Sequence, residues 1–336
     1  MYPNVSIIIL NWNGWKDTLE CLESLYQINY PNYDIILIDN DSKDNSVEKI
    51  KEYCEGKIEP KSKYLHYDII KPIKVSEYTN KELEFFKNNT KKFNAEDSRL
   101  ILIKNDKNYG FAGGNNIGIC FSLKNLQPDY ILLLNNDTVV EKNFLKELVK
   151  TAESQTDIGF IGAKTFFYDK ENIIQVAGGS YISSRFLTLE LGLNHIDDGS
   201  YDIETDLDYI SGSCVLCKAE MLKKIGLMDT NYFMYWEDAD WGIRGKKYGY
   251  KSAYSYKSKI WHKVGSSSQS YFQEYYFYRN RIYFMRKNKN KKDYFKFIVK
   301  FFAFIFLLES KYFLINKKDI KGYKNYLSAI LDGFKV

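Results

Sequence analysis

Residues 5–14 read VSIIILNWNG, and the fold class follows from this stretch. Its first six residues are an unbroken apolar run rich in β-branched side chains, which is typical of a strand buried on both faces of a parallel sheet. A polar turn follows, and residues 17–26 then carry leucines at helical spacing. Residues 33–53 repeat this order with the run YDIILI, a polar group and a second helical segment. Two successive βα units predict an α/β fold with a doubly wound, mostly parallel sheet.

The alternation continues along the chain with one interruption. We expect further strands at residues 100–103, 129–134, 158–163, 209–216 and 251–256, and helices at 143–153, 218–225, 237–248 and 270–287. Residues 56–97 break the rhythm, because they are rich in Lys and Asn and contain only weak apolar clusters. We interpret this segment as an insertion in the fold.

The composition is that of a folded globular protein. The 336 residues are 45% hydrophobic and 27% charged, which argues against general disorder. Five cysteines are an odd number for a disulfide framework. Cys214 and Cys217 form one C-x-x-C pair without the second pair that a zinc site needs, and burial as small apolar side chains explains them as well.

Polar side chains follow four of the predicted strands. They are Asn11 and Asn13, then Asp39, Asn40 and Asp41, then the glycine-rich segment 110–116, and finally Asn135, Asn136 and Asp137. Ligands bind beyond the carboxyl ends of the strands in open parallel sheets. Carboxylates and amides suit a divalent cation and hydrogen bonds to a nucleoside, and segment 110–116 adds N–H groups at a helix start. The alternative is that these residues only form turns. Neither a G-x-G-x-x-G fingerprint after the first strand nor a P-loop is present, which disfavours an NAD enzyme and a P-loop ATPase.

A second group of candidate residues lies in the stretch YWEDADWGIR, residues 235–244. Acids at a helix start serve as caps and dipole partners, but this explains one acid better than three. Aromatic rings beside carboxylates also suit the binding of a sugar ring and the deprotonation of its hydroxyl, which favours acceptor contacts from Trp236, Glu237 and Trp241. His262 is one of only three histidines, and a lone histidine is more often structural than a ligand.

Taken in order, these motifs resemble family 2 glycosyltransferases with the GT-A fold, especially the rhamnosyltransferase-like branch of surface-polysaccharide enzymes. The matching segments are VSIIILNWNG, IDNDSKDNS, NYGFAGGNNIGI, YILLLNNDT, SGSCVLCKAEMLKKIGLMD, FMYWEDADWGIR and WHKVGSSS. The resemblance implies an inverting transfer from a nucleotide-diphosphate sugar, dTDP-rhamnose or a UDP-sugar, to a hydroxyl of a glycan or polyprenyl-linked acceptor. It also implies a divalent cation, Mg²⁺ or Mn²⁺.

The resemblance implies a role for each matching residue. It assigns donor binding to Asn11, Asp39, Gly113, Asn116 and Asn136, metal binding to Asp137, His262 and Asn135, and the general base to Asp238. Asn135 stands where the family has the first Asp of its D-x-D motif, so we expect it to be a weaker ligand than Asp137. Two other functions stay open: a sugar-1-phosphate nucleotidylyltransferase, and a nucleotide-sugar-binding subunit without transfer activity.

We expect a catalytic domain over residues 1–268, with a nucleotide-binding half at 1–140 and an acceptor half at 141–268, followed by a helical extension at 269–336. The N-terminus lacks the features of a signal peptide, so we expect a cytosolic body.

Basic residues are concentrated in the extension. Residues 279–336 hold 15 basic and 4 acidic side chains, while the rest of the chain is mildly acidic, which does not fit a nucleic-acid groove. The eight-residue apolar run 301–308 is too short to span a bilayer and is flanked by lysines. We therefore expect the extension to bind the anionic cytoplasmic face of the membrane. The alternative is a helix that docks on the catalytic domain or forms a dimer interface.

Overall fold

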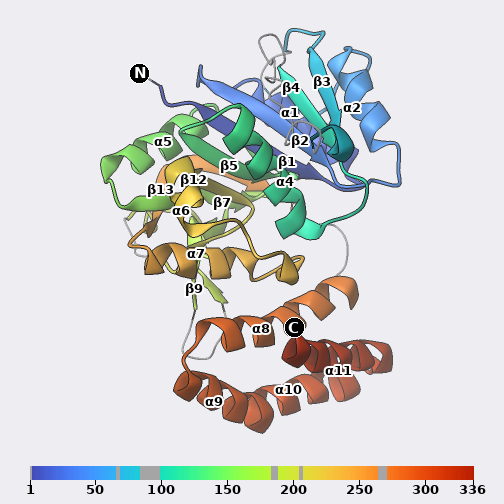
Figure 1. Ribbon diagram of the computed structural model, residues 1–336, viewed down its shortest axis with the longest axis vertical. Helices are drawn as coiled ribbons and strands as arrows, with labels where there is room; N and C mark the ends of the chain where they lie inside the picture. Colours follow the sequence, from blue (N-terminus) through green and yellow to red (C-terminus); the bar gives the residue numbers. More distant parts are fainter. Residues whose placement is uncertain (1, 66–68, 84–98, 183–187, 204–206, 264–270) are drawn as a thin grey trace.

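The structure is a computed structural model that describes residues 2–65, 69–83, 99–182, 188–203, 207–263 and 271–336. One mixed sheet forms its centre, with the strand order β3-β4-β2-β1-β5-β12-β7-β13-β6 (Figure 1). Its strands are β1 (Val5–Asn11), β2 (Tyr33–Asp39), β3 (Val75–Thr79), β4 (Leu100–Lys104), β5 (Tyr130–Asn135), β6 (Thr138–Val140), β7 (Ile158–Phe167), β12 (Cys214–Lys218) and β13 (Lys251–His262), and β8 (Lys170–Ala177) pairs with β7.

Helices cover both faces of this sheet. They are α1 (Trp15–Leu25), α2 (Ser46–Cys54), α4 (Gly110–Asn125), α5 (Phe144–Ser154), α6 (Ala219–Ile225) and α7 (Glu237–Lys247). Alternate residues of β1 enter different cores: Ile7 packs with α1, α2 and α5, whereas Ile8 packs with α4, α6 and α7. The β12 residues Cys214 and Cys217 also belong to opposite cores, so they act as separate buried apolar side chains and not as a metal or redox pair.

The strands β3, β4, β2, β1 and β5 are all parallel, which confirms the predicted doubly wound half of the sheet. The register places Asn11 beside Asp39, and Leu10 beside Asn135. The carboxyl ends of three strands therefore meet at one edge, as the polar turns predicted.

The prediction for residues 56–97 was partly wrong. Residues 75–79 form β3, an edge strand parallel to β4, and so belong to the sheet. All five residues of β3 are only partly buried, and such a strand does not show the continuous apolar run of a central strand. The predicted insertion also includes residues 66–68 and 84–98, which lie outside the described residues.

The other half of the sheet is mixed, and two predicted strands differ from those observed. Residues 209–216 do not form one strand: β11 (Tyr209–Ile210) joins a small sheet with β9 (Gly179–Ile182) and β10 (Thr188–Glu190), while β12 lies antiparallel between β5 and β7. The strand predicted at 251–256 continues to residue 262, because its last three residues pair with β6. This pairing sets His262 opposite Thr138, next to Asp137.

The C-terminal residues form a helical layer below α7 (Figure 1). Its elements are α8 (Tyr271–Asn288), α9 (Lys291–Lys300), the π-turn η2 (Phe301–Ile305), α10 (Phe306–Lys311), the π-turn η3 (Tyr312–Asn316) and α11 (Ile320–Lys335). Their apolar core includes Tyr209, Tyr232 and Trp236 of the α/β body, so the layer is packed onto that body. Among the described residues, no helix has the length and apolar character needed to cross a bilayer.

Candidate active site

A histidine–carboxylate pair lies at the carboxyl end of the sheet. Asp137 follows β5, and His262 ends β13, with its Nε2 atom 3.0 Å from Oδ1 of Asp137. Nδ1 of His262 donates a hydrogen bond to Oε1 of Gln175 at 2.8 Å, so the nitrogen that faces Asp137 is the one that carries no proton in the neutral ring. The Nδ2 atom of Asn135 lies 3.4 Å from the same nitrogen.

This pair fits a divalent cation. Nε2 of the imidazole and a carboxylate oxygen face each other, and the hydrogen bond that the far ring nitrogen makes to Gln175 fixes the ring, as is usual for histidines that bind metals. Within the described ranges, no three His, Cys, Asp or Glu side chains gather around a possible metal position. Diphosphate oxygens of a bound nucleotide would have to complete the coordination, which is a common arrangement for Mg²⁺.

The candidate base Asp238 lies in the first turn of α7. Its Oδ2 atom accepts a hydrogen bond from the Gly212 amide at 3.2 Å, and Oδ1 accepts one from the Ala239 amide at 2.8 Å. Burial raises the pKa of Asp238 to about 6, and these two backbone bonds oppose the rise.

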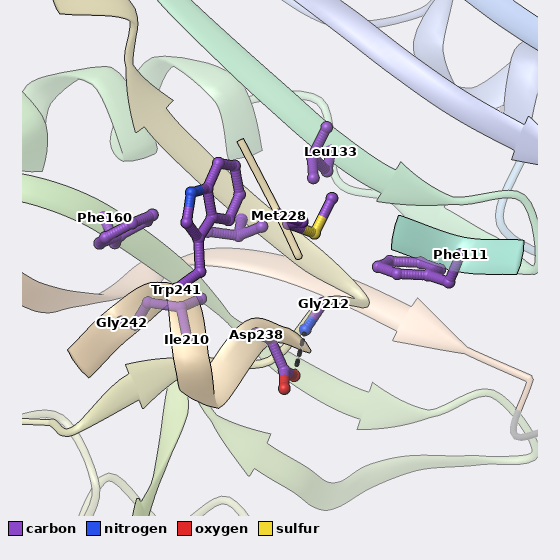
Figure 2. Close-up of a pocket in the computed structure, with 10 residues that line it drawn as sticks. Phe111, Leu133, Phe160, Ile210, Gly212, Met228, Asp238, Trp241 and Gly242 are labelled. Carbon is purple, nitrogen blue, oxygen red and sulfur yellow. Dashed lines mark hydrogen bonds between the residues drawn. The ribbon is translucent and has the colours of Figure 1, made fainter. Parts of the chain in front are cut away.

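A small cavity of about 10 Å³, which can hold at most one water molecule, adjoins this carboxylate. Figure 2 shows the hydrogen bond from the Gly212 amide to Asp238. Phe111, Met228 and Trp241 are among the other side chains that line the cavity. These apolar neighbours explain why the charged form of Asp238 is poorly solvated.

A much larger cavity, of about 1010 Å³, brings the two groups of candidate residues together. Its walls include Asn135 and His262 from the sheet end, and Trp236, Glu237 and Asp238 from the start of α7. Both Glu237 and Trp236 are buried, and neither Oε2 of Glu237 nor Nε1 of Trp236 has a hydrogen-bond partner. Burial and the charge of Asp238 raise the pKa of Glu237 well above its ordinary value, which favours the protonated form.

Two residues near the site were not predicted. Glu190, on β10, lines the large cavity, and burial together with the charge of Asp238 raises its pKa. Gln175, on β8, orients His262. Neither residue follows a strand of the parallel half, which was the signal used to find site residues.

The predicted donor residue Asn11 does not face an open site. It is fully buried, its Nδ2 donates to Oδ1 of Asp39 at 2.8 Å, and its Oδ1 accepts from the Thr18 hydroxyl at 2.9 Å. Asn136 donates to the same hydroxyl at 3.0 Å. The prediction that Asn11 contacts the donor is therefore corrected: Asn11 joins the ends of β1 and β2 and holds the Asp39 carboxylate.

The helix start at α4 also differs from the prediction. Asn116 uses both ends of its amide on the Met228 backbone, at 2.8 and 3.1 Å, so it joins α4 to residue 228 and does not line a donor site. A Cβ atom at Gly113 would lie 2.9 Å from Cβ of Tyr109, so this glycine serves close packing. Segment 110–116 was expected to offer backbone N–H groups to a ligand, but its Phe111 and Ala112 amides donate to the Phe233 carbonyl.

The prediction that Trp241 contacts the acceptor was wrong. The side chain is 2% exposed, and its indole N–H donates to the Gly226 carbonyl at 2.9 Å. It packs edge-on against Phe160, behind Asp238. Trp241 therefore supports the cavity wall behind Asp238, because the helical period of α7 turns it into the core.

Two family models match the chain. Glycosyl transferase family 2 matches residues 6–68, and the glycosyltransferase-like family 2 model matches residues 76–283, which is more than half of the chain.

Curated relatives include three glycosyltransferases. The chain is 24% identical over 263 residues to the dTDP-rhamnosyl transferase RfbF of Shigella flexneri. This alignment covers 72% of this chain and 80% of the relative. It is 26% identical over 174 residues to the rhamnosyltransferase WbbL of Escherichia coli, covering 49% and 65%. It is 27% identical over 148 residues to a low-salt glycan biosynthesis hexosyltransferase of Haloferax volcanii, covering 44% and 47%. The chain thus spans about half to two thirds of the length of the last two relatives.

Solved structures share the fold at low sequence identity. A mannosyltransferase from Pyrobaculum calidifontis in complex with GDP-Man and Mn²⁺ matches with a TM-score of 0.55 at 13% identity, covering 100% of this chain and 76% of the other. Staphylococcus aureus TarS in complex with UDP-GlcNAc matches with a TM-score of 0.53 at 12% identity, covering 98% and 80%. The chain has the GT-A fold and belongs to glycosyltransferase family 2, with rhamnosyltransferases among its relatives.

Proposed function

We propose that this protein transfers a rhamnosyl or hexosyl group, with inversion, from a nucleotide-diphosphate sugar to a hydroxyl of a glycan acceptor. The observation that carries the proposal is a partly buried carboxylate, Asp238, whose pKa is raised to about 6 and which lines the same cavity as His262 and Asn135. The names of the rhamnosyltransferase relatives and the sugar nucleotides bound by the structural neighbours support it.

Asp238 acts as the general base in this proposal. It takes the proton of the acceptor hydroxyl while the hydroxyl oxygen forms a bond to the anomeric carbon and the bond from that carbon to the diphosphate breaks. A single displacement of this kind inverts the anomeric configuration. A pKa near 6 suits the task, because the carboxylate is ionised at neutral pH and is more basic than an ordinary aspartate.

Asp137 and His262 would hold the divalent cation, with Asn135 beside them as a neutral amide. The cation, when bound, offsets the negative charge that develops on the departing diphosphate. Gln175 keeps the metal-binding nitrogen of His262 turned toward Asp137. Asp39, held by Asn11, and Asn136 are the remaining candidates for nucleotide contacts at this end of the sheet.

Trp236 and Glu237 would bind the acceptor. Both line the cavity beside Asp238, and each has a buried polar atom without a partner. Buried polar groups are nearly always hydrogen-bonded, so these atoms are suited to sugar hydroxyls. With its raised pKa, Glu237 can donate a hydrogen bond while Asp238 accepts the proton. In this proposal the nucleotide contacts come from residues 1–140 and the acceptor contacts from residues 141–268, and His262 of the second half joins Asp137 at the cation.

We also propose that the C-terminal layer binds an anionic membrane surface. Several large apolar side chains around η2 and α10 are more than half exposed: Phe295, Phe304, Leu307, Leu308 and Ile315. Lysines surround them, including Lys292, Lys296, Lys300 and Lys311. Apolar side chains flanked by lysines suit a lipid headgroup boundary. Leu308 and Tyr312 also line the large cavity, which suits an acceptor carried on a polyprenyl lipid.

A screen of dTDP-rhamnose and UDP-sugars tests the transfer, measured as donor hydrolysis and as sugar transfer, with and without Mn²⁺. Release of the nucleoside diphosphate together with sugar transfer from one donor supports the proposal, and Asp238→Asn is expected to lower transfer by about 10²–10⁴-fold. Tight donor binding without any turnover would favour the alternative, a nucleotide-sugar-binding subunit.

A further inference from the structure

The segment that leads into α7 has an unusual backbone. It joins the short helix η1 (Thr230–Tyr232) to the start of α7, and Phe233, Tyr235 and Trp236 all have positive φ, at 64°, 67° and 75°. Residues other than glycine seldom adopt this conformation, and they keep it only where the surroundings hold them. Asp238 lies two residues after this segment, so whatever holds the segment also sets the position of the candidate base.

One side chain from the C-terminal layer holds this segment. Nδ2 of Asn280, on α8, donates to the carbonyl oxygens of Tyr232, Met234 and Tyr235 at 2.6, 2.7 and 2.9 Å. Asn280 is fully buried, and its Oδ1 atom has no partner. An amide with two N–H groups is thus shared among three carbonyls, at a side chain that solvent does not reach.

The Phe233 carbonyl, which Asn280 does not bind, accepts hydrogen bonds from the start of α4. Phe233 O accepts the Phe111 and Ala112 amides at the start of α4, at 2.6 and 3.2 Å. The Asp240 amide then donates to Trp236 O at 2.9 Å, which begins the hydrogen bonding of α7. The backbone of residues 232–235 is therefore held between α4 and Asn280. These hydrogen bonds set the position at which α7 begins.

Further contacts from α8 hold the flanks of the same segment. Lys287 bridges Asp229, before the segment, and Asp240, after it, at 2.6 and 3.0 Å. Asn288 donates to Oδ1 of Asp240 at 2.8 Å, and the Tyr283 hydroxyl donates to Asp229 at 2.8 Å. These bonds fix where α7 lies relative to α8, whereas Asn280 fixes the turn that starts α7.

We propose that Asn280 is a positioning residue for Asp238. It acts through the carbonyls of residues 232–235 and holds the Asp238 carboxylate at the cavity wall. The C-terminal helical layer is then a part of the catalytic centre and not a separable anchor. This inference rests on the proposed function in one respect, that Asp238 is the base.

A double-mutant cycle tests the proposal. The variants are Asn280→Ala, Asp238→Asn and the double variant, each assayed in the full chain for transfer in single turnovers, for donor affinity and for helical content. The control is Asn325→Ala, which removes a similar bond from an asparagine amide to a backbone carbonyl, that of Tyr271 at the start of α8.

We expect Asn280→Ala to keep its donor affinity and to lower kcat by about 10²-fold, because small displacements of a reacting group cost that much. Asn325→Ala should keep the wild-type kcat. In the Asp238→Asn background, Asn280→Ala should not lower kcat further, because the side chain that Asn280 positions can no longer accept a proton.

A further loss of the same size in that background would overturn the proposal and make Asn280 a merely structural residue. If Asn280→Ala does not fold, Asn280→Ser, which keeps one donor, takes its place in the cycle, and unfolding of both variants would also overturn the proposal. Full activity of Asp238→Asn alone would instead refute the assignment of the base, so the two failures are distinguishable.

Discussion

Nε2 of His262 lies 3.0 Å from Oδ1 of Asp137, although the two residues come from opposite halves of the chain. The antiparallel pairing of β13 with β6 brings them together, and the contact of Gln175 with Nδ1 fixes the ring so that Nε2 faces the carboxylate. This relationship underlies the first two predictions.

Removal of the metal should abolish transfer. Excess EDTA is expected to stop activity, and Mn²⁺ should restore it, because a diphosphate beside Asp137 and Asp39 is repelled without a cation. Asp137→Ala should lose both Mn²⁺ and donor affinity, and His262→Ala should lose less, as measured by isothermal titration. Asp157→Ala, which removes a surface ion pair with Lys251, is the control. Full activity in excess EDTA would contradict the metal site.

Loss of the hydrogen bond that orients the His262 ring should weaken Mn²⁺ binding. Gln175→Ala is expected to lower Mn²⁺ affinity by about 10–100-fold, since side chains that orient a metal-binding histidine commonly contribute this much. Titration of Mn²⁺ in the presence of the nucleoside diphosphate measures the effect. An unchanged affinity would show that Gln175 does not orient a metal ligand.

Transfer should depend on the ionisation of Asp238. Burial raises its pKa to about 6, so the base is protonated and inactive below that pH and ionised above it. We expect kcat/KM to fall about tenfold per pH unit below pH 6. Asp238→Asn should lower transfer by about 10²–10⁴-fold while donor binding stays nearly intact. Wild-type turnover in this variant, or an acid limb near pH 4, would exclude Asp238 as the base.

Glu237 should contribute to acceptor binding as a neutral donor. Its pKa is raised well above the ordinary value, so Glu237→Gln keeps an uncharged hydrogen-bond donor and should retain the acceptor KM. Glu237→Ala should raise the acceptor KM by about tenfold, the usual worth of one hydrogen bond of about 1.4 kcal/mol. Steady-state kinetics with varied acceptor distinguish the two. A large rise in KM for the glutamine variant would mean that the charged form binds.

Membrane binding should depend on the exposed apolar side chains of η2 and α10. Phe304→Glu and Leu307→Glu are expected to reduce sedimentation with vesicles that contain anionic lipid, and high salt should weaken binding of the wild-type protein. Ile70→Glu, an equally radical change at an exposed apolar residue on the catalytic body, should leave it unchanged. Undiminished vesicle binding by both Glu variants would show that these side chains do not anchor the protein, and absence of vesicle binding by the wild-type protein would favour a layer that only docks on the body or forms a dimer interface.

The sequence alone determined the parallel strands β1, β2, β4 and β5 of the central sheet and the two regions that carry polar candidates. Strands such as β1 and β5 are buried on both faces, and burial on both faces leaves a continuous apolar run that can be read without a partner. The edge strand β3 left no such run because it is only partly buried. The order of the motifs was sufficient to indicate the family.

Only the tertiary structure decided which polar side chains face the cavity and which hold the fold. Asn11, Asn116 and Trp241 have residue types suited to ligand contacts, yet their polar atoms are used by partners distant in sequence or turned into the core. Gln175 and Asn280 lie within a strand and a helix, with no local signal of a role. A residue's type fixes which hydrogen bonds it can make, whereas its partner depends on strand register and helix packing across the whole chain.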